Sequence, residues 1–240
     1  MTRAKSVLIT GTDTGVGKTI ICHHLAAYLQ SRGLNVITQK WVQSGCTVSD
    51  DIREHHITLS VSAAQIPNLP ELRCPYSLPY EASPHLAAKI QGVEIKAARI
   101  EEALMTLERY FDMVLVEGSG GALVPLNEEI LMADMAMRLN MSVLVVAANR
   151  LGAINHTLLT LEALTARGIH VRGLIFNRVE NSVDQTILHD NIRVISQFAN
   201  VPVLGEMPFM TGLKEAEAGF VPIGKAFYRL WQEKKNEKLA

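Results

Sequence analysis

The chain has 240 residues, of which 48% are hydrophobic and 20% charged; a disordered or low-complexity protein is therefore excluded, and a sizeable core is expected. Its 23 Lys and Arg side chains balance 24 Asp and Glu, leaving a net charge of −1, so no overall field attracts nucleic acid or an acidic membrane. Three cysteines without CxxC spacing, no signal-peptide pattern and no apolar run of membrane length lead us to expect a cytoplasmic protein without nucleic-acid or membrane partners.

Short β-branched runs alternate with amphipathic stretches along the chain. We expect strands over residues 6–10, 35–39, 113–116, 142–148 and 171–177, and helices over residues 19–30, 96–110, 128–139, 154–167 and 183–198. This alternation predicts one α/β domain over residues 1–240, with a doubly wound, mostly parallel sheet flanked by helices. Residues 45–84 contain four prolines and are expected to form loops that cover or build a site, and the charged stretch 232–238 is expected to end a solvated helix.

A glycine-rich segment lies between the first expected strand and the first expected helix. It reads Gly11-Thr12-Asp13-Thr14-Gly15-Val16-Gly17-Lys18-Thr19. Such a segment is typical of a P-loop of the NTPase type: backbone N–H groups and the helix N-terminus bind phosphate, the lysine reaches the terminal phosphates and the threonine hydroxyl reaches Mg²⁺. The strict pattern has glycine where Thr12 stands, so the loop is a variant. A purely structural glycine turn is the alternative to nucleotide binding.

The chromosome-partitioning and septum-site ATPases and the nitrogenase iron protein have another variant P-loop, with a lysine that reaches across a dimer. This chain has Asp13 at that position. A carboxylate cannot neutralise a partner's phosphate, which weighs against an ATP-driven dimer switch of that kind.

Two charged residues come at the ends of expected strands. Lys40 follows the second strand, and Glu117 follows the third and precedes Gly118-Ser119-Gly120-Gly121. Because the carboxyl ends of parallel strands face the ligand crevice, we expect Lys40 to point toward the P-loop and Glu117 to organise Mg²⁺. A solvated lysine and a turn glutamate are the alternatives. Ser83 before Pro84 is a helix N-cap pattern, which is compatible with a role in binding.

The ordered set GTDTGVGKT, KWVQSG, EASPH, VEGSGG and LGAIN, with a strand ending in Asn177, resembles the dethiobiotin synthetase family from Lys5 to about Met210. The resemblance implies ATP-dependent closure of a ureido ring. In that family an amine of 7,8-diaminopelargonic acid captures CO₂ as a carbamate, the carbamate attacks the γ-phosphate of ATP, and the second amine displaces phosphate from the mixed anhydride. The resemblance also implies Mg²⁺ and a homodimer that binds the substrate carboxylate across its interface.

Residue roles follow from the resemblance position by position. The catalytic residues would be Lys18, Thr19 and Lys40, and the Mg²⁺ ligands Thr19, Glu117 and Asp51, with Asp50 as the alternative to Asp51. The nucleotide would contact Thr14, Gly15, Val16, Gly17, Lys18, Thr19, Ile20, Asp51, Glu117, Gly118, Ser119, Gly120, Asn177, Arg178, Pro208, Phe209 and Met210. The substrate would contact Thr14, Lys40, Ser44, Ser83, Gly120, Gly121, Gly152, Ala153, Ile154 and Asn155.

Some features of the sequence depart from the family pattern. Trp41 replaces the usual proline, Gly15 stands where an acidic residue is frequent, and the loop over residues 45–51 looks short.

An enzyme of the cobyrinic acid diamide synthase type would need a further glutamine-hydrolysing domain, which we do not expect here. A regulatory ATPase is opposed by Asp13 and the near-neutral charge, and a degenerate, non-catalytic paralogue is opposed by the intact Lys18, Thr19, Lys40 and Glu117.

Overall fold

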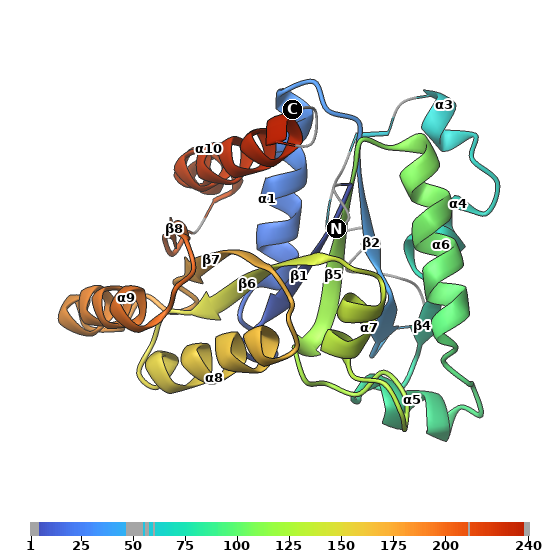
Figure 1. Cartoon of the computed structure of the whole chain (residues 1–240), viewed down its shortest axis with the longest axis horizontal. Helices are drawn as coiled ribbons and strands as arrows, with labels where there is room; N and C mark the ends of the chain where they lie inside the picture. The colour runs from blue at the N-terminus through green and yellow to red at the C-terminus, as the bar shows by residue number, and fades with distance from the viewer. Residues whose placement is uncertain (1–4, 47–54, 56–57, 60, 211, 238–240) are drawn as a thin grey trace.

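The core of the structure is a six-stranded sheet with the strand order β2-β5-β1-β6-β7-β8, in which every neighbouring pair is parallel (Figure 1). The structure, a computed structural model, describes residues 5–46, 55, 58–59, 61–210 and 212–237. The strands of the sheet are β1 (Ser6–Gly11), β2 (Val36–Lys40), β5 (Met113–Gly121), β6 (Ser142–Ala148), β7 (Val171–Asn177) and β8 (Val203–Met207). The predicted α/β fold with a mostly parallel sheet is confirmed.

Helices cover both faces of this sheet, so its strands are buried from both sides. One apolar cluster joins α1 (Lys18–Ser31) and α10 (Leu213–Glu237) to one face through residues such as Leu25 and Phe227. The other cluster packs α6 (Ala97–Tyr110), α7 (Met132–Arg138), α8 (Ala153–Ala166) and α9 (Gln185–Phe198) against the opposite face. Figure 1 shows α1 with α10 on one side and α8 with α9 on the other.

Most expected elements appear within a residue or two of their expected bounds, and two differences concern the helices. The helix expected over residues 128–139 begins only at Met132, because the Asn127 carboxamide accepts the backbone N–H groups of Glu129 and Ile130, both at 2.9 Å. This side-chain turn replaces the first helical turn. Strand β8 and most of helix α10 were not expected, although the end of α10 includes most of the charged stretch 232–238.

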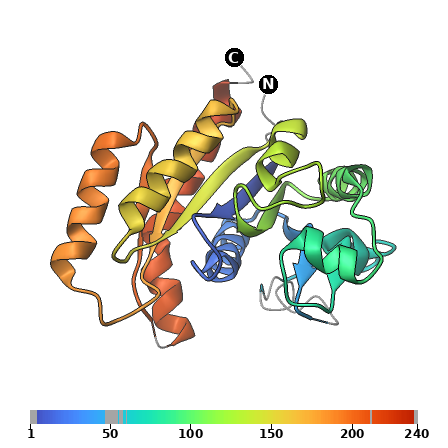
Figure 2. The same ribbon diagram turned by 90° about the horizontal axis from the view of Figure 1, so that it is seen from below.

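The stretch over residues 45–84 contains more regular structure than the expected loops. It includes α3 (Val61–Ala64), α4 (Leu69–Arg73), β4 (Tyr76–Leu78) and the start of α5 (Pro84–Ile90). Strand β4 pairs in parallel with β3 (Val42–Ser44), which directly follows β2. In Figure 2 this region lies at the side of the molecule opposite α9.

The strand order places the site at the carboxyl ends of three neighbouring strands. Strand β1 lies between β5 and β6, and the chain leaves β1 toward β2 on one side, whereas β6 leads to β7 on the other. Ligands of open α/β sheets bind at such a switch point. Within the described part of the chain, no helix has the length and apolar character needed to cross a membrane.

Candidate nucleotide and substrate site

The P-loop connects β1 to α1 in a conformation that requires glycine. Gly17 has φ of 90°, in the left-handed region, and a Cβ there would lie 2.1 Å from Nδ2 of Asn177. The same Nδ2 donates a hydrogen bond of 2.9 Å to the carbonyl of Val16. Asn177 ends β7, so the side chain expected at the nucleotide base also supports the P-loop.

Lys18 is nearly buried at the start of α1. Its Nζ donates to the backbone carbonyl of Asp13 at 3.0 Å, within the same loop. Burial lowers the pKa of Lys18 to about 8; Lys40 adds to this shift and Glu117 opposes it. A lysine held in this way is poised to exchange a neutral carbonyl for an anionic phosphate.

The carboxylate of Glu117, buried in the middle of β5, brings two predicted site residues together. The strand was expected to end before Glu117, but it continues to Gly121, so residues 118–121 belong to β5 and not to a turn. Its Oε1 accepts hydrogen bonds from Thr19 Oγ1 at 3.0 Å and from Lys40 Nζ at 2.8 Å. Its Oε2 lies 2.7 Å from Nε2 of His55. Burial alone would raise the pKa of Glu117, but the hydrogen bond from His55 and the charge of Lys40 outweigh it and lower the pKa to about 2. Glu117 is therefore a full carboxylate near the P-loop.

His55 is the site residue that the sequence did not reveal. Its contact with Glu117 spans 62 residues of sequence. Asp51 and its alternative Asp50 lie outside the described residues. The described residues contain no cluster of three His, Cys, Asp or Glu side chains able to hold a metal.

The donors near Glu117 nevertheless suit Mg²⁺. Thr19 and Glu117 present a hydroxyl and a carboxylate oxygen 3.0 Å apart at the start of the P-loop helix. Mg²⁺ takes oxygen ligands and usually keeps several waters, with one or two carboxylates and phosphate oxygens completing its shell.

A cavity of about 700 Å³ extends from the P-loop past Lys40 and Glu117. Its far wall includes Ser44 and Ser83, with Ser44 Oγ donating to the carbonyl of Ala82 at 2.7 Å. Ser83 precedes α5 as its N-cap residue, and its hydroxyl lies 3.1 Å from Nδ1 of His85. Ser119 also lines the cavity, where its hydroxyl bonds the carbonyl of Val42. Lys18, Lys40, Ser44 and Ser83, which are predicted to contact phosphate or substrate, thus share one cleft.

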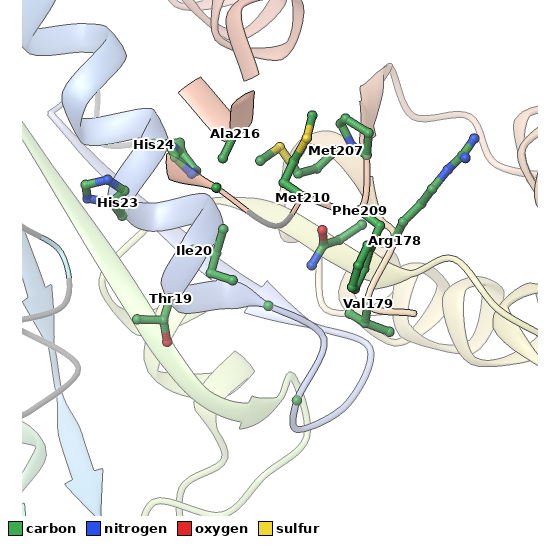
Figure 3. Close-up of a pocket in the computed structure, with 15 residues that line it drawn as sticks. Thr19, Ile20, His23, His24, Arg178, Val179, Met207, Phe209, Met210 and Ala216 are labelled. Atoms are coloured by element: carbon green, nitrogen blue, oxygen red, sulfur yellow. The ribbon is translucent and has the colours of Figure 1, made fainter. Parts of the chain in front are cut away.

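A second cavity of about 600 Å³ begins on the other side of the P-loop (Figure 3). Both cavities are lined by Gly15, Gly17, Thr19 and Ile20, which makes them neighbours across the start of α1. The predicted base-binding residues Asn177, Arg178, Pro208, Phe209 and Met210 all line the second cavity. Arg178 is paired with Glu206 at 2.7 Å.

Some predicted residues lie outside these two cavities. Gly121 lies beside the backbone of Gly11, and the side chain of Val16 is buried beneath the P-loop. Residues 152–155, at the start of α8, line neither cavity. Trp41, which departs from the family pattern, is fully buried in the core and does not face the cleft.

Comparisons with known proteins agree on one family. A family model described as an AAA domain matches residues 5–217. The chain is 41% identical over 207 residues to ATP-dependent dethiobiotin synthetase BioD of Chlorobaculum tepidum, a match that covers 86% of each protein. It is 36% identical over 223 residues to the BioD protein of Anoxybacillus flavithermus, covering 89% of this chain and 96% of that one.

Solved structures with a similar backbone are P-loop proteins of much lower sequence identity. Apo McdA of Cyanthece matches with a TM-score of 0.59 and 15% identity over 95% of this chain and 98% of that chain. The MinC:MinD cell division complex of Aquifex aeolicus gives 0.58 and 14% identity, over 97% and 96% of the two chains. At such identities the likeness concerns the fold alone.

Proposed function

The chain belongs to the family of ATP-dependent dethiobiotin synthetases, and we propose that it closes the ureido ring of dethiobiotin from 7,8-diaminopelargonic acid and CO₂. ATP is the co-substrate, and ADP and phosphate are released. One amine of the diamine forms a carbamate, and a carbamate oxygen attacks the γ-phosphate. The second amine then attacks the carbonyl carbon of the mixed anhydride and expels phosphate.

The contacts of Glu117 carry this proposal. Lys40 from β2 and Thr19 from α1 meet on this carboxylate beside a P-loop. In our proposal Lys18 leaves the Asp13 carbonyl to bind the phosphates, and Lys40 turns toward the carbamate and the γ-phosphate. Both lysines then balance the negative charge that spreads over the transferring group, which is the main task of a protein in phosphoryl transfer.

We assign Thr19 and Glu117 to a bound Mg²⁺, and Asp51 stays a predicted third ligand. When bound, Mg²⁺ neutralises charge on the β- and γ-phosphate oxygens. The two side chains already point at one another near the phosphate-binding turn, so little reorganisation is needed to offer both oxygens to one cation.

The second cavity is proposed to hold the adenosine. Ile20 and Phe209 are large apolar side chains on its walls, and Asn177 and Arg178 supply polar groups at the end of β7 (Figure 3). Ser44, Ser83 and residues 118–120 of β5 would contact the diamine in the first cavity.

A homodimer would complete the substrate site. Residues 152–155 form the start of α8, and the N-terminus of a helix suits a carboxylate. Since these residues line neither cavity, we propose that they receive the carboxylate of a substrate bound to a second copy of the chain. A single 240-residue domain working in the cytoplasm is part of the same proposal.

The deciding experiment measures phosphate release from the purified protein with ATP, Mg²⁺ and bicarbonate, with and without 7,8-diaminopelargonic acid. We expect diamine-dependent release and a product with the mass of dethiobiotin. Diamine-independent hydrolysis, stimulated instead by DNA or a protein partner, would contradict the proposal and favour a regulatory ATPase.

A further inference from the structure

We propose that His55 is a positioning residue for this reaction: its imidazole holds one oxygen of Glu117 so that the other faces Thr19 and the bound Mg²⁺. The inference rests on the proposed function, because it concerns the carboxylate assigned to the metal. It adds a residue that the sequence motifs do not contain.

The two oxygens of Glu117 have different partners. Lys40 and Thr19 both donate to Oε1, whereas Oε2 is bound by His55 at 2.7 Å. The side chain of His55 is fully buried and that of Glu117 is 2% exposed. Water therefore does not replace the imidazole at Oε2, and His55 fixes which oxygen faces the P-loop.

The chemistry of the two groups assigns the proton between them. An ionised carboxylate only accepts hydrogen bonds, so Nε2 of His55 is the donor. While Nε2 carries this proton it has no lone pair for a metal ion. Its other ring nitrogen, Nδ1, has no hydrogen-bond partner among the residues that the structure describes, so no described group competes with Glu117 for the ring.

Helix α1 holds His55 in register with the P-loop. Nδ1 of His23 lies 2.7 Å from the backbone carbonyl of His55. A carbonyl only accepts, so His23 donates here. His23 lies one helical turn after Thr19, and Figure 3 shows both side chains on the same side of α1. The helix that supplies the hydroxyl of Thr19 thus also anchors the residue that orients Glu117.

Removal of His55 should loosen the carboxylate without removing any proposed metal ligand. The terminal torsion of a glutamate is broad, so an unheld Glu117 can rotate and offer both oxygens to Lys40. Loss of a group that orients a metal ligand typically weakens metal binding about 10- to 100-fold.

The test uses Mn²⁺ as a spectroscopic probe in the presence of ADP, so that no turnover is required. Electron paramagnetic resonance would give the Mn²⁺ affinity of the full chain and of His55→Leu, His55→Gln and Glu117→Gln. We expect His55→Leu to weaken Mn²⁺ about 10- to 100-fold, and His55→Gln, which keeps an N–H donor, to restore most of the loss. ADP affinity in EDTA should be unchanged in both His55 variants. The exposed His189, changed to leucine, is the control for loss of a histidine.

The outcomes separate this inference from the proposed function. If Glu117→Gln weakens Mn²⁺ and a folded His55→Leu does not, His55 only fills space and the inference is wrong. If Glu117→Gln also leaves Mn²⁺ binding unchanged, Glu117 is not a metal ligand. Both the metal assignment and the role of His55 are then wrong. If His55→Gln gives no recovery, and ¹⁵N-histidine labelling shows nitrogen bound to Mn²⁺, His55 is a ligand and the positioning role is overturned.

Discussion

The two cavities that meet at the P-loop are lined by different kinds of side chain. The first cavity, which contains Lys40, is organised around the charges of Lys18, Lys40 and Glu117, and these are already paired with one another or with a backbone carbonyl. The second cavity has apolar side chains such as Phe209 and Met210 on its walls, and its Arg178 is paired with Glu206.

This difference indicates a division of work. Apolar walls stabilise a bound base equally before and during the reaction, so they contribute affinity. Charged side chains that redirect toward a transferring phosphoryl group contribute more in the transition state than in the ground state. Variants on the two sides should therefore change different kinetic constants.

The largest effect is expected from Lys40→Ala on the charged side. The rate constant for ring closure should fall about 100- to 1000-fold, the usual cost of removing one group that stabilises transition-state charge. ATP affinity by calorimetry should change little, because Lys40 ends β2 and donates a hydrogen bond to Glu117. Lys96→Ala, at an exposed lysine paired with Glu94, is the matched control. Near-normal turnover would remove Lys40 from the mechanism.

A smaller effect of a different kind is expected from Phe209→Ala on the apolar side. Loss of stacking on a base costs about 1–3 kcal/mol, so KM for ATP should rise roughly tenfold while kcat at saturating ATP stays the same. Steady-state kinetics with varied ATP measures both constants. Phe198→Ala, at a phenylalanine that is 74% exposed, should change neither. A fall in kcat without a change in KM would contradict the proposed division.

The smallest expected effect is a pH dependence confined to the charged side. The pKa of Lys18 is about 8 in the empty protein, and a bound phosphate favours its charged form, so binding raises this pKa. The affinity for ATP is then highest below pH 8, where Lys18 is charged in the empty protein. It falls as the pH rises above 8, by roughly fourfold between pH 7 and 8.5. Calorimetry in two buffers with different protonation enthalpies should detect proton uptake above pH 8. Phe209→Ala should keep this pH dependence, and a pH-independent affinity would show that Lys18 is charged throughout.

The residues of the charged side could be picked out from the sequence because their signals are local. The P-loop carries its own pattern. Lys40 ends β2, and the parallel pairing of β2 with β5 places it opposite Glu117. His55 was missed because no local pattern marks it, and its role depends on a contact with a distant strand.

Helix α10 was missed for a different reason. Pro222 and Gly224 interrupt its pattern, and both disfavour helix interiors. A Cβ at residue 224 would lie 2.5 Å from the ring of Tyr28, so glycine lets α10 pack closely on α1. Tertiary packing outweighs local propensity here, and a single sequence does not display it.

The short parallel pair of β3 and β4 has a consequence for how the family can vary in length. Gly45 donates its N–H to the carbonyls of Leu78 and Tyr80, at 2.9 and 3.2 Å, and Ser44 bonds Ala82. These bonds tie the wall around Ser83 to the end of β3, whatever the length of chain between them. Extra residues at the exposed Gln65 or Asn68 would enlarge a closed loop at a cost of only about 0.6 kcal/mol per doubling. Evolution, or an engineer placing a reporter near the cleft, can therefore lengthen this stretch while the wall stays where it is.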